Sequence, residues 1–196
     1  MRIIAGVHKG RRLVTPRGDV TRPTADQVRI ALMDTLMPWL PGARVLDLFA
    51  GAGGVGLEAL SRGAAHITFV ERDARAVAAL RDNIVALGVA PAVRVLREDV
   101  ARALARLARE GERFGVIFLD PPYEAEATTP TLVALGAGDV LAAGALVVAQ
   151  HLTKRAPGDV AGVLRAFRTR RFGETTLTFF RAGGYDAPST SPSPRG

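Results

Sequence analysis

Residues 44–56 read RVLDLFAGAGGVG, a short apolar run followed by a glycine-rich turn. The run has the length of a buried strand, and the glycines from Gly51 to Gly56 match the G-x-G-x-x-G spacing that joins a strand to a helix. Glycine permits a tight turn and a close approach of the backbone to a ligand, and the helix that follows offers free N–H groups. The stretch predicts a cofactor site after the first strand of an α/β domain.

Further short apolar runs alternate with amphipathic segments along the rest of the chain. Alternation of this kind is typical of an α/β sandwich with a mainly parallel sheet. We predict an α/β fold with a doubly wound, Rossmann-like, mostly parallel seven-stranded sheet that ends in a C-terminal antiparallel hairpin. The expected strands are 44–48, 66–70, 93–96, 115–119, 145–149, 166–171 and 175–181, and the expected helices are 55–61, 73–87, about 100–110 and about 128–136.

The first 40 residues differ from this pattern. They predict a small appendage with a β-hairpin and a helix: strands 3–5 and 12–14 around a turn, then a helix over about 25–37 that Thr24 caps. The helix has a predicted buried stripe of Val28, Leu32, Thr35 and Leu36. We therefore divide the chain into the appendage at 1–40, the α/β domain at 41–182 and a disordered tail, rich in Gly, Ser and Pro, at 183–196.

Composition excludes several classes of protein. The 196 residues contain no cysteine, which excludes disulfides and thiolate metal sites, and the three histidines lie far apart in sequence. No apolar stretch approaches the roughly 20 residues that span a bilayer, and basic residues interrupt the N-terminus before a signal peptide could form. We expect a soluble, cytoplasmic protein with no metal and no membrane partner.

Positive charge is concentrated at the N-terminus. The formal net charge is +7, and residues 1–30 supply +5 of it. Such a concentration indicates a polyanionic partner, although a solvated basic end that aids solubility gives the same pattern. Arginine favours the first interpretation because its planar fork pairs with phosphate oxygens. The predicted RNA-binding residues are Arg2, Lys9, Arg11, Arg12, Arg22 and Arg29.

The glycine motif alone fits a nicotinamide dinucleotide, a flavin or an S-adenosyl cofactor. Glu71 ends the second strand at the distance expected for a carboxylate that binds ribose hydroxyls. Asp47, four residues before Gly51, would repel a pyrophosphate but suits a cofactor with an ammonium and a sulfonium, so S-adenosylmethionine is favoured. Asp99, after the third strand, either binds the adenine amino group or caps the next helix.

A second motif, Asp120-Pro121-Pro122-Tyr123, follows the fourth strand. Proline has no backbone N–H, so this turn presents carbonyl oxygens without competing donors. The Asp120 carboxylate and the Pro121 carbonyl can accept the two hydrogens of an exocyclic amine, and the Tyr123 ring can stack on the base. The motif predicts a receptor for a planar amine.

These residues resemble a known family. Asp120–Tyr123 is similar to the [DN]-P-P-[YFW] motif of methyltransferases that act on amino groups of bases. With residues 2–6, 10–13, 22–29 and 56–65, the chain resembles the bacterial family that methylates the 2-amino group of one guanine in small-subunit (16S) ribosomal RNA. The resemblance covers about residues 2–181. Gln150 departs from it, because we expect a glutamate after the fifth strand in this family.

The resemblance implies methyl transfer from S-adenosylmethionine to the guanine 2-amino nitrogen, with ribosomal RNA or a small-subunit assembly intermediate as partner. The sequence does not specify the oligomeric state, for which a monomer is our expectation. The implied catalytic residues are Asp120, Pro121, Pro122 and Tyr123. The implied cofactor-binding residues are Thr24, Asp47, Phe49, Ala50, Gly51, Gly53, Glu71, Arg72, Asp99, Val100 and Asp120. The alternatives are an adenine-N6 methyltransferase that uses the same site on DNA or RNA, an NAD-dependent oxidoreductase and a non-catalytic RNA-binding module.

Overall fold

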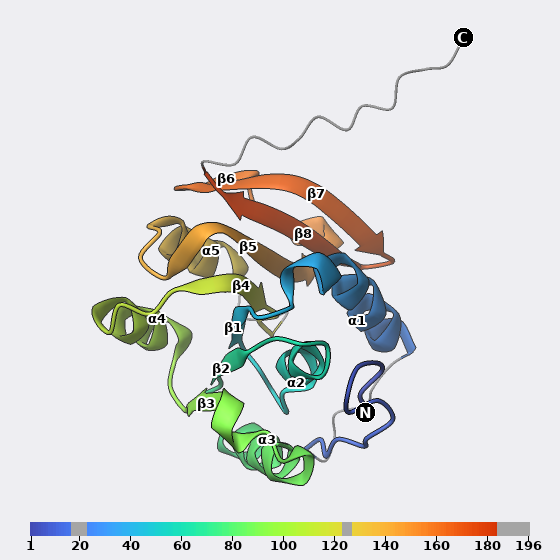
Figure 1. The fold of residues 1–196 in the computed structure, drawn as a ribbon. Coiled ribbons are helices and arrows are strands. Elements are labelled where there is room, and N and C mark those ends of the chain that lie inside the picture. Colours follow the sequence, from blue (N-terminus) through green and yellow to red (C-terminus); the bar gives the residue numbers. More distant parts are fainter. Residues whose placement is uncertain (17–22, 123–126, 184–196) are drawn as a thin grey trace.

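A computed structural model describes residues 1–16, 23–122 and 127–183, without the side chains of residues 23–26. One eight-stranded sheet runs through it in the order β3-β2-β1-β4-β5-β8-β7-β6 (Figure 1). Strands β1 to β5 are parallel to one another, and β8, β7 and β6 continue the sheet as antiparallel neighbours. The strands are β1 Arg44–Leu48, β2 His66–Val70, β3 Val93–Leu96, β4 Phe114–Leu119, β5 Leu141–Leu152, β6 Val160–Ala161, β7 Leu164–Phe172 and β8 Thr175–Ala182.

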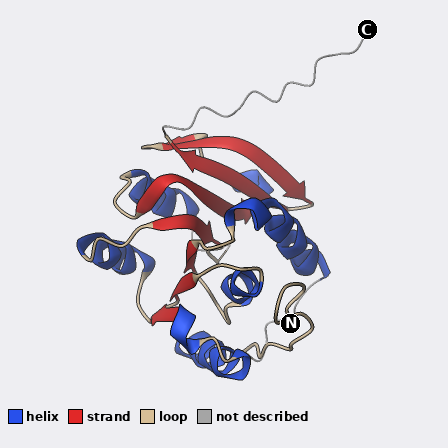
Figure 2. Ribbon diagram, viewed as in Figure 1, coloured by secondary structure: helices blue, strands red, loops and turns tan. Residues whose placement is uncertain are grey.

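Helices cover both faces of the sheet (Figure 2). In β1, Val45 packs with α1, α2 and α3 in one apolar cluster, whereas its neighbour Leu46 packs with α4 and α5 in the other. This alternation follows from the two-residue period of a strand. The α-helices are α1 Pro23–Leu36, α2 Gly54–Ser61, α3 Ala74–Leu87, α4 Val100–Arg109 and α5 Thr128–Gly136, and the 3₁₀ helices are η1 Met37–Trp39, η2 Ala90–Ala92 and η3 Thr153–Arg155.

The α/β architecture is therefore confirmed, and two details of the sheet are corrected. The sheet has eight strands rather than seven, because β6 consists of only two residues that pair with Leu164 and Arg165. A strand this short leaves no recognisable apolar run in the sequence. Strand β5 is also longer than residues 145–149, because it extends through Gly144 at one end and through the polar pair Gln150-His151 at the other.

The N-terminal segment, residues 1–16, keeps only part of the hairpin that the sequence predicts: backbone hydrogen bonds join Ile3 to Gly10 and Arg11, and Met1 to Leu13. In place of two strands the described residues contain one isolated bridge between Arg2 and Arg12. Helix α1 begins at Pro23, so Thr24 lies inside the helix rather than capping it. Of the predicted stripe, Val28, Leu32 and Leu36 are buried, whereas Thr35 is only half-buried. The predicted tail lies almost wholly outside the described residues.

Helix α2 holds the N-terminal segment in place. Glu58, whose exposed fraction is 0 %, accepts hydrogen bonds from the Ile4 N–H at 2.7 Å and the Ala5 N–H at 2.9 Å. Its Oε1 also accepts from Arg62 Nε at 2.8 Å. One turn further on, the Ser61 hydroxyl accepts from the His8 N–H and donates to the Ala5 carbonyl. The buried Glu58 carboxylate thus accepts the hydrogen bonds that the Ile4 and Ala5 N–H groups would otherwise donate to a neighbouring strand.

We predict that Glu58→Ala detaches this segment. The change leaves two backbone N–H groups and the Arg62 guanidinium without their acceptor, and the expected loss is roughly 2–4 kcal/mol in the free energy of unfolding. Hydrogen exchange should accelerate at Ile4 and Ala5 but not in β1. Glu174→Ala, at the exposed turn between β7 and β8, is the matched control. Unchanged exchange at Ile4 would contradict the assignment.

Candidate active site

The carboxyl ends of β1, β2 and β4 bring three predicted acids together. Because β1 pairs in parallel with β2 on one side and β4 on the other, Asp47, Glu71 and Asp120 lie at one edge of the sheet. The Asp120 N–H donates to the Leu48 carbonyl across this edge at 3.4 Å. In parallel sheets, ligands bind outside the carboxyl ends of the strands, so this edge is the candidate site.

Asp47 is the most buried of the three, with an exposed fraction of 2 %. Burial raises the pKa of Asp47 to about 7, and the charges of Asp120 and Glu71 act in the same direction. A hydrogen bond of 2.9 Å from the Gly56 N–H, in the first turn of α2, opposes that shift. Burial also raises the pKa of Asp120 to about 7. Two carboxyl groups that ionise near neutral pH therefore stand at the centre of the site.

Glu71 fixes the glycine loop to the end of β2. Its Oε2 accepts from the Gly51 N–H at 2.8 Å, and its Oε1 accepts from the Asp73 N–H at 2.8 Å. The loop also contains Phe49, the one non-glycine residue of positive φ in the described part of the chain, at 63°. Beside it, the Ala50 N–H donates to the Val70 carbonyl. The loop is thus held to the end of β2 by the N–H groups of Ala50 and Gly51.

The glycines of the loop have different surroundings. A Cβ on Gly56 would lie 2.3 Å from the Phe69 ring, and one on Gly53 would lie 2.4 Å from Leu80. These two positions are glycine because a helix packs closely there. A Cβ on Gly51 would instead meet nothing within 4 Å. Gly51 therefore borders the space where a ligand can approach the backbone.

Asp99 caps helix α4, one of its two expected roles. Its Oδ1 accepts from the Ala101 N–H at 2.9 Å, and the side chain is exposed. The contact with an adenine amino group stays a prediction. The next residue, Val100, is buried in the apolar cluster under α4, and Arg72, beyond the end of β2, is exposed.

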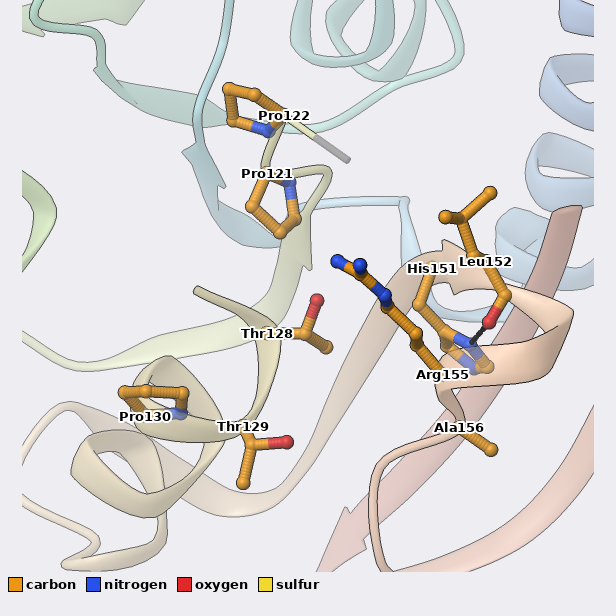
Figure 3. Close-up of a pocket in the computed structure, with 9 residues that line it drawn as sticks. All are labelled: Pro121, Pro122, Thr128, Thr129, Pro130, His151, Leu152, Arg155 and Ala156. Carbon is orange, nitrogen blue, oxygen red and sulfur yellow. Dashed lines mark hydrogen bonds between the residues drawn. The ribbon is translucent and has the colours of Figure 1, made fainter. Parts of the chain in front are cut away.

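A cavity of about 480 Å³ opens beside the Pro121-Pro122 turn (Figure 3). Sequence reasoning missed most of its wall, which comes from the start of α5, the end of β5 and η3. The signal in the sequence that could have pointed to this wall was the polar pair Gln150-His151 at the end of β5. The lining residues are Pro121, Pro122, Thr128, Thr129, Pro130, His151, Leu152, Arg155 and Ala156.

Some predicted residues lie outside the described part of the chain, namely Tyr123, Arg22 and the side chain of Thr24. Of the predicted RNA-binding residues that are described, one differs from the rest: Arg29 has an exposed fraction of 7 % and donates to the Arg2 carbonyl at 3.0 Å. It joins α1 to the N-terminal segment. The exposed members of the predicted set are Arg2, Lys9, Arg11 and Arg12.

Within residues 1–16, 23–122 and 127–183, no group of three or more His, Asp or Glu side chains is placed to hold a metal ion. In the same ranges, no helix is both long and apolar enough to cross a membrane.

Known proteins similar to this chain include two relatives found by sequence and one solved structure. Putative rRNA methyltransferase YlbH of Bacillus subtilis is 36% identical over 184 residues, which are 94% of this chain and 100% of that one. Ribosomal RNA small subunit methyltransferase D of Escherichia coli is 41% identical over 123 residues, or 63% of this chain and 60% of that one. An Escherichia coli structure described as a putative methyltransferase has a TM-score of 0.81 and 32% identity, and the match covers 93% of this chain and 97% of that one.

The sheet order, the glycine loop and the acidic strand ends define an S-adenosylmethionine-dependent methyltransferase. Within this class, the family model described as Conserved hypothetical protein 95 matches residues 1–181, and the chain belongs to that family. Membership confirms the resemblance that the motifs indicate.

Gly56, which packs against Phe69, and Gly51, which has open space beside it, give two contrasting predictions. Gly56→Ala should lower the free energy of unfolding by roughly 1–3 kcal/mol, because the new methyl group overlaps the Phe69 ring. Gly51→Ala should cost only about 1 kcal/mol, for a positive φ of 54°, yet weaken S-adenosylmethionine binding. Thermal unfolding and titration calorimetry separate the two effects. Wild-type affinity in Gly51→Ala would show that no ligand approaches this backbone.

Proposed function

We propose that this protein transfers a methyl group from S-adenosylmethionine to the exocyclic 2-amino group of a guanine in small-subunit ribosomal RNA. The observation that carries the proposal is Asp120, a carboxyl group of raised pKa beside Asp47 that is followed by two prolines. The name of the Escherichia coli relative, a small-subunit ribosomal RNA methyltransferase, supports the choice of substrate.

The residues at the sheet edge fit the cofactor. S-adenosylmethionine, when bound, supplies an electrophilic methyl group on a positively charged sulfur and also carries an ammonium group. Burial disfavours the ionised forms of Asp47 and Asp120. A nearby cation stabilises those ionised forms. Glu71, at the end of β2, is assigned to the ribose hydroxyls and Asp99 to the adenine. The remaining proposed contacts are Thr24, Phe49, Ala50, Gly51, Gly53, Arg72 and Val100.

Asp120 and Pro121 hold the amine. The guanine 2-amino nitrogen is a poor nucleophile because its lone pair is delocalised into the ring. Hydrogen bonds from its two hydrogens to the Asp120 carboxylate and the Pro121 carbonyl pyramidalise the nitrogen, so that its lone pair is less delocalised, and they stabilise the positive charge that develops there. Asp120, with a pKa of about 7, accepts the proton that the nitrogen loses as it takes the methyl group. Tyr123 is assigned to stacking on the flipped base.

The N-terminal segment is the proposed RNA contact. Arg2, Lys9, Arg11 and Arg12 are exposed on it, while the buried carboxylate of Glu58 fixes its backbone. Exposed cations on a fixed backbone suit phosphate contacts better than a solvated tail does. Glu58→Ala, which should free the segment, should therefore also weaken RNA binding while S-adenosylmethionine binding remains.

Asp120→Ala tests the amine receptor. The change removes the side-chain oxygens that accept an amine hydrogen, so we expect methyl transfer to fall by about 100-fold or more. Nucleoside mass spectrometry of small-subunit ribosomal RNA, treated with wild type and variant, measures the product. N2-methylguanosine is the expected wild-type product, and N6-methyladenosine would favour the adenine alternative instead. Full activity in Asp120→Ala would eliminate the proposed role.

Cofactor affinity should depend on pH. Because the raised pKa values keep Asp47 and Asp120 protonated below about pH 6, a cationic ligand must release protons there in order to bind. Affinity for S-adenosylmethionine should therefore rise between about pH 6 and pH 8, by at most about tenfold per pH unit for each proton released. Calorimetry in buffers of different ionisation enthalpy counts those protons.

S-adenosylhomocysteine is the control for that experiment, since it keeps the ammonium but lacks the sulfonium charge. We expect it to show a weaker pH dependence. An affinity for S-adenosylmethionine that stays constant from pH 6 to pH 8 would mean that neither carboxyl group faces the cofactor's charges.

A further inference from the structure

The cavity beside the Pro121-Pro122 turn is lined by apolar and polar side chains in nearly equal parts. Three of its lining residues are prolines, which present ring carbons and have no N–H to offer, and Leu152 and Ala156 add apolar surface. Its volume of about 480 Å³ lies within the range of small-molecule sites, roughly 300–1,000 Å³. The proline rings offer a surface on which a planar ring can pack, and the polar side chains can bind the edge of that ring.

His151 forms part of the wall without offering a polar edge. Its Nδ1 donates to the Leu152 carbonyl at 2.9 Å, and its Nε2 accepts from the Thr178 hydroxyl at 2.8 Å. Burial lowers the pKa of His151, so the ring is neutral at physiological pH. Both ring nitrogens are therefore occupied within the protein, and the positive charge among the lining residues belongs to Arg155.

Arg155 extends from η3 into the cavity toward Pro121, and Thr128 lines the same cavity (Figure 3). Arg155 is thus opposite the turn that carries the proposed amine acceptors. A guanidinium presents its N–H donors as a rigid fork, and two acceptors side by side match that fork. On guanine the matching pair is O6 and N7.

We propose that Arg155 binds O6 and N7 of the target guanine and so selects guanine over adenine. The inference rests on the proposed function, because it places the guanine 2-amino group at Asp120 and Pro121. On a purine, that amino group and the O6–N7 edge lie at opposite sides of the ring system, so the two walls of the cavity hold one base between them. Adenine carries an amino group in place of O6. That amino group is itself a donor and would face the donors of Arg155 unfavourably.

A phosphate contact by Arg155 is the competing interpretation, and N7 distinguishes the two. Replacing N7 by carbon, as in 7-deazaguanosine, removes one acceptor and leaves the Watson–Crick edge and the phosphates unchanged. Small-subunit ribosomal RNA transcribed with guanosine or with 7-deazaguanosine triphosphate provides the two substrates, as naked RNA and after reconstitution with subunit proteins. The measured quantity is the ratio of kcat/KM for methyl transfer to the two.

Wild type should prefer guanosine RNA by about tenfold, within the range for loss of part of a bidentate contact. Arg155→Gln should be slower on guanosine RNA and should have a ratio near one. Lys154→Gln removes the same charge from the neighbouring exposed residue of η3, which does not line the cavity, and should keep the wild-type ratio. Any general effect of 7-deazaguanosine on RNA folding cancels when variants are compared.

If Arg155→Gln is inactive, two further measurements still test the inference. Arg155→Lys retains the charge but not the fork, and it should behave as Arg155→Gln does in the ratio. Binding of guanosine and 7-deazaguanosine monophosphates to the protein saturated with S-adenosylhomocysteine, followed by NMR, reports the same preference without turnover. Thermal unfolding checks that each variant is folded.

The outcomes separate the inference from the function on which it rests. A wild-type ratio in Arg155→Gln, with N2-methylguanosine as the wild-type product, would overturn the role of Arg155 alone. Equal losses on both RNAs in Arg155→Gln and Lys154→Gln, with a reduced salt dependence, would assign Arg155 to phosphate. A wild-type product other than N2-methylguanosine would overturn the proposed function, and the role of Arg155 with it.

Discussion

The hydrogen bond from the Gly56 N–H to Asp47 connects the central strand to the first helix of the α/β domain, and the active site is arranged around it. This single bond is made to a carboxyl group that is otherwise enclosed, so it offsets only part of the cost of burial. Glu71 and Asp120 on the flanking strands add repulsion. The ionised form of Asp47 is therefore unfavourable at this edge of the sheet.

That electrostatic constraint selects the cofactor. A dinucleotide would bring a pyrophosphate to the end of β1, where it would meet Asp47 and its acidic neighbours. A cofactor with an ammonium and a sulfonium relieves the same repulsion. The glycine spacing is shared by both kinds of site, so the motif alone does not decide between them. The acid before the glycines does, because it determines the sign of the charge that the site accepts.

The elements that sequence predicts well are those whose pattern is local. Buried parallel strands are short apolar runs, and the acids at their ends follow at fixed positions, so β1, Asp47 and Asp120 could be located in advance. Strand β6 has two residues and leaves no pattern. The extent of the N-terminal strands was predicted wrongly for another reason. Ile4 and Ala5 donate to Glu58, more than 50 residues away, and no local periodicity records those hydrogen bonds.

The parts of the site that sequence missed depend on tertiary packing. Arg155 belongs to a three-residue 3₁₀ helix that follows an unexpectedly long β5, and its place beside the Pro-Pro turn results from the order of strands in the sheet. Arg29 is the opposite case. Its charge suggested a surface role, but α1 places it against the Arg2 carbonyl, where it ties two segments together.

Helix α2 connects these observations. It has only eight residues, too few for a helix to be stable by itself, so its position depends on what both of its sides contact. Its first turn donates to Asp47, while Glu58 and Ser61 further along bind the backbone of the N-terminal segment. The proposed RNA contact and the cofactor site thus share one short helix.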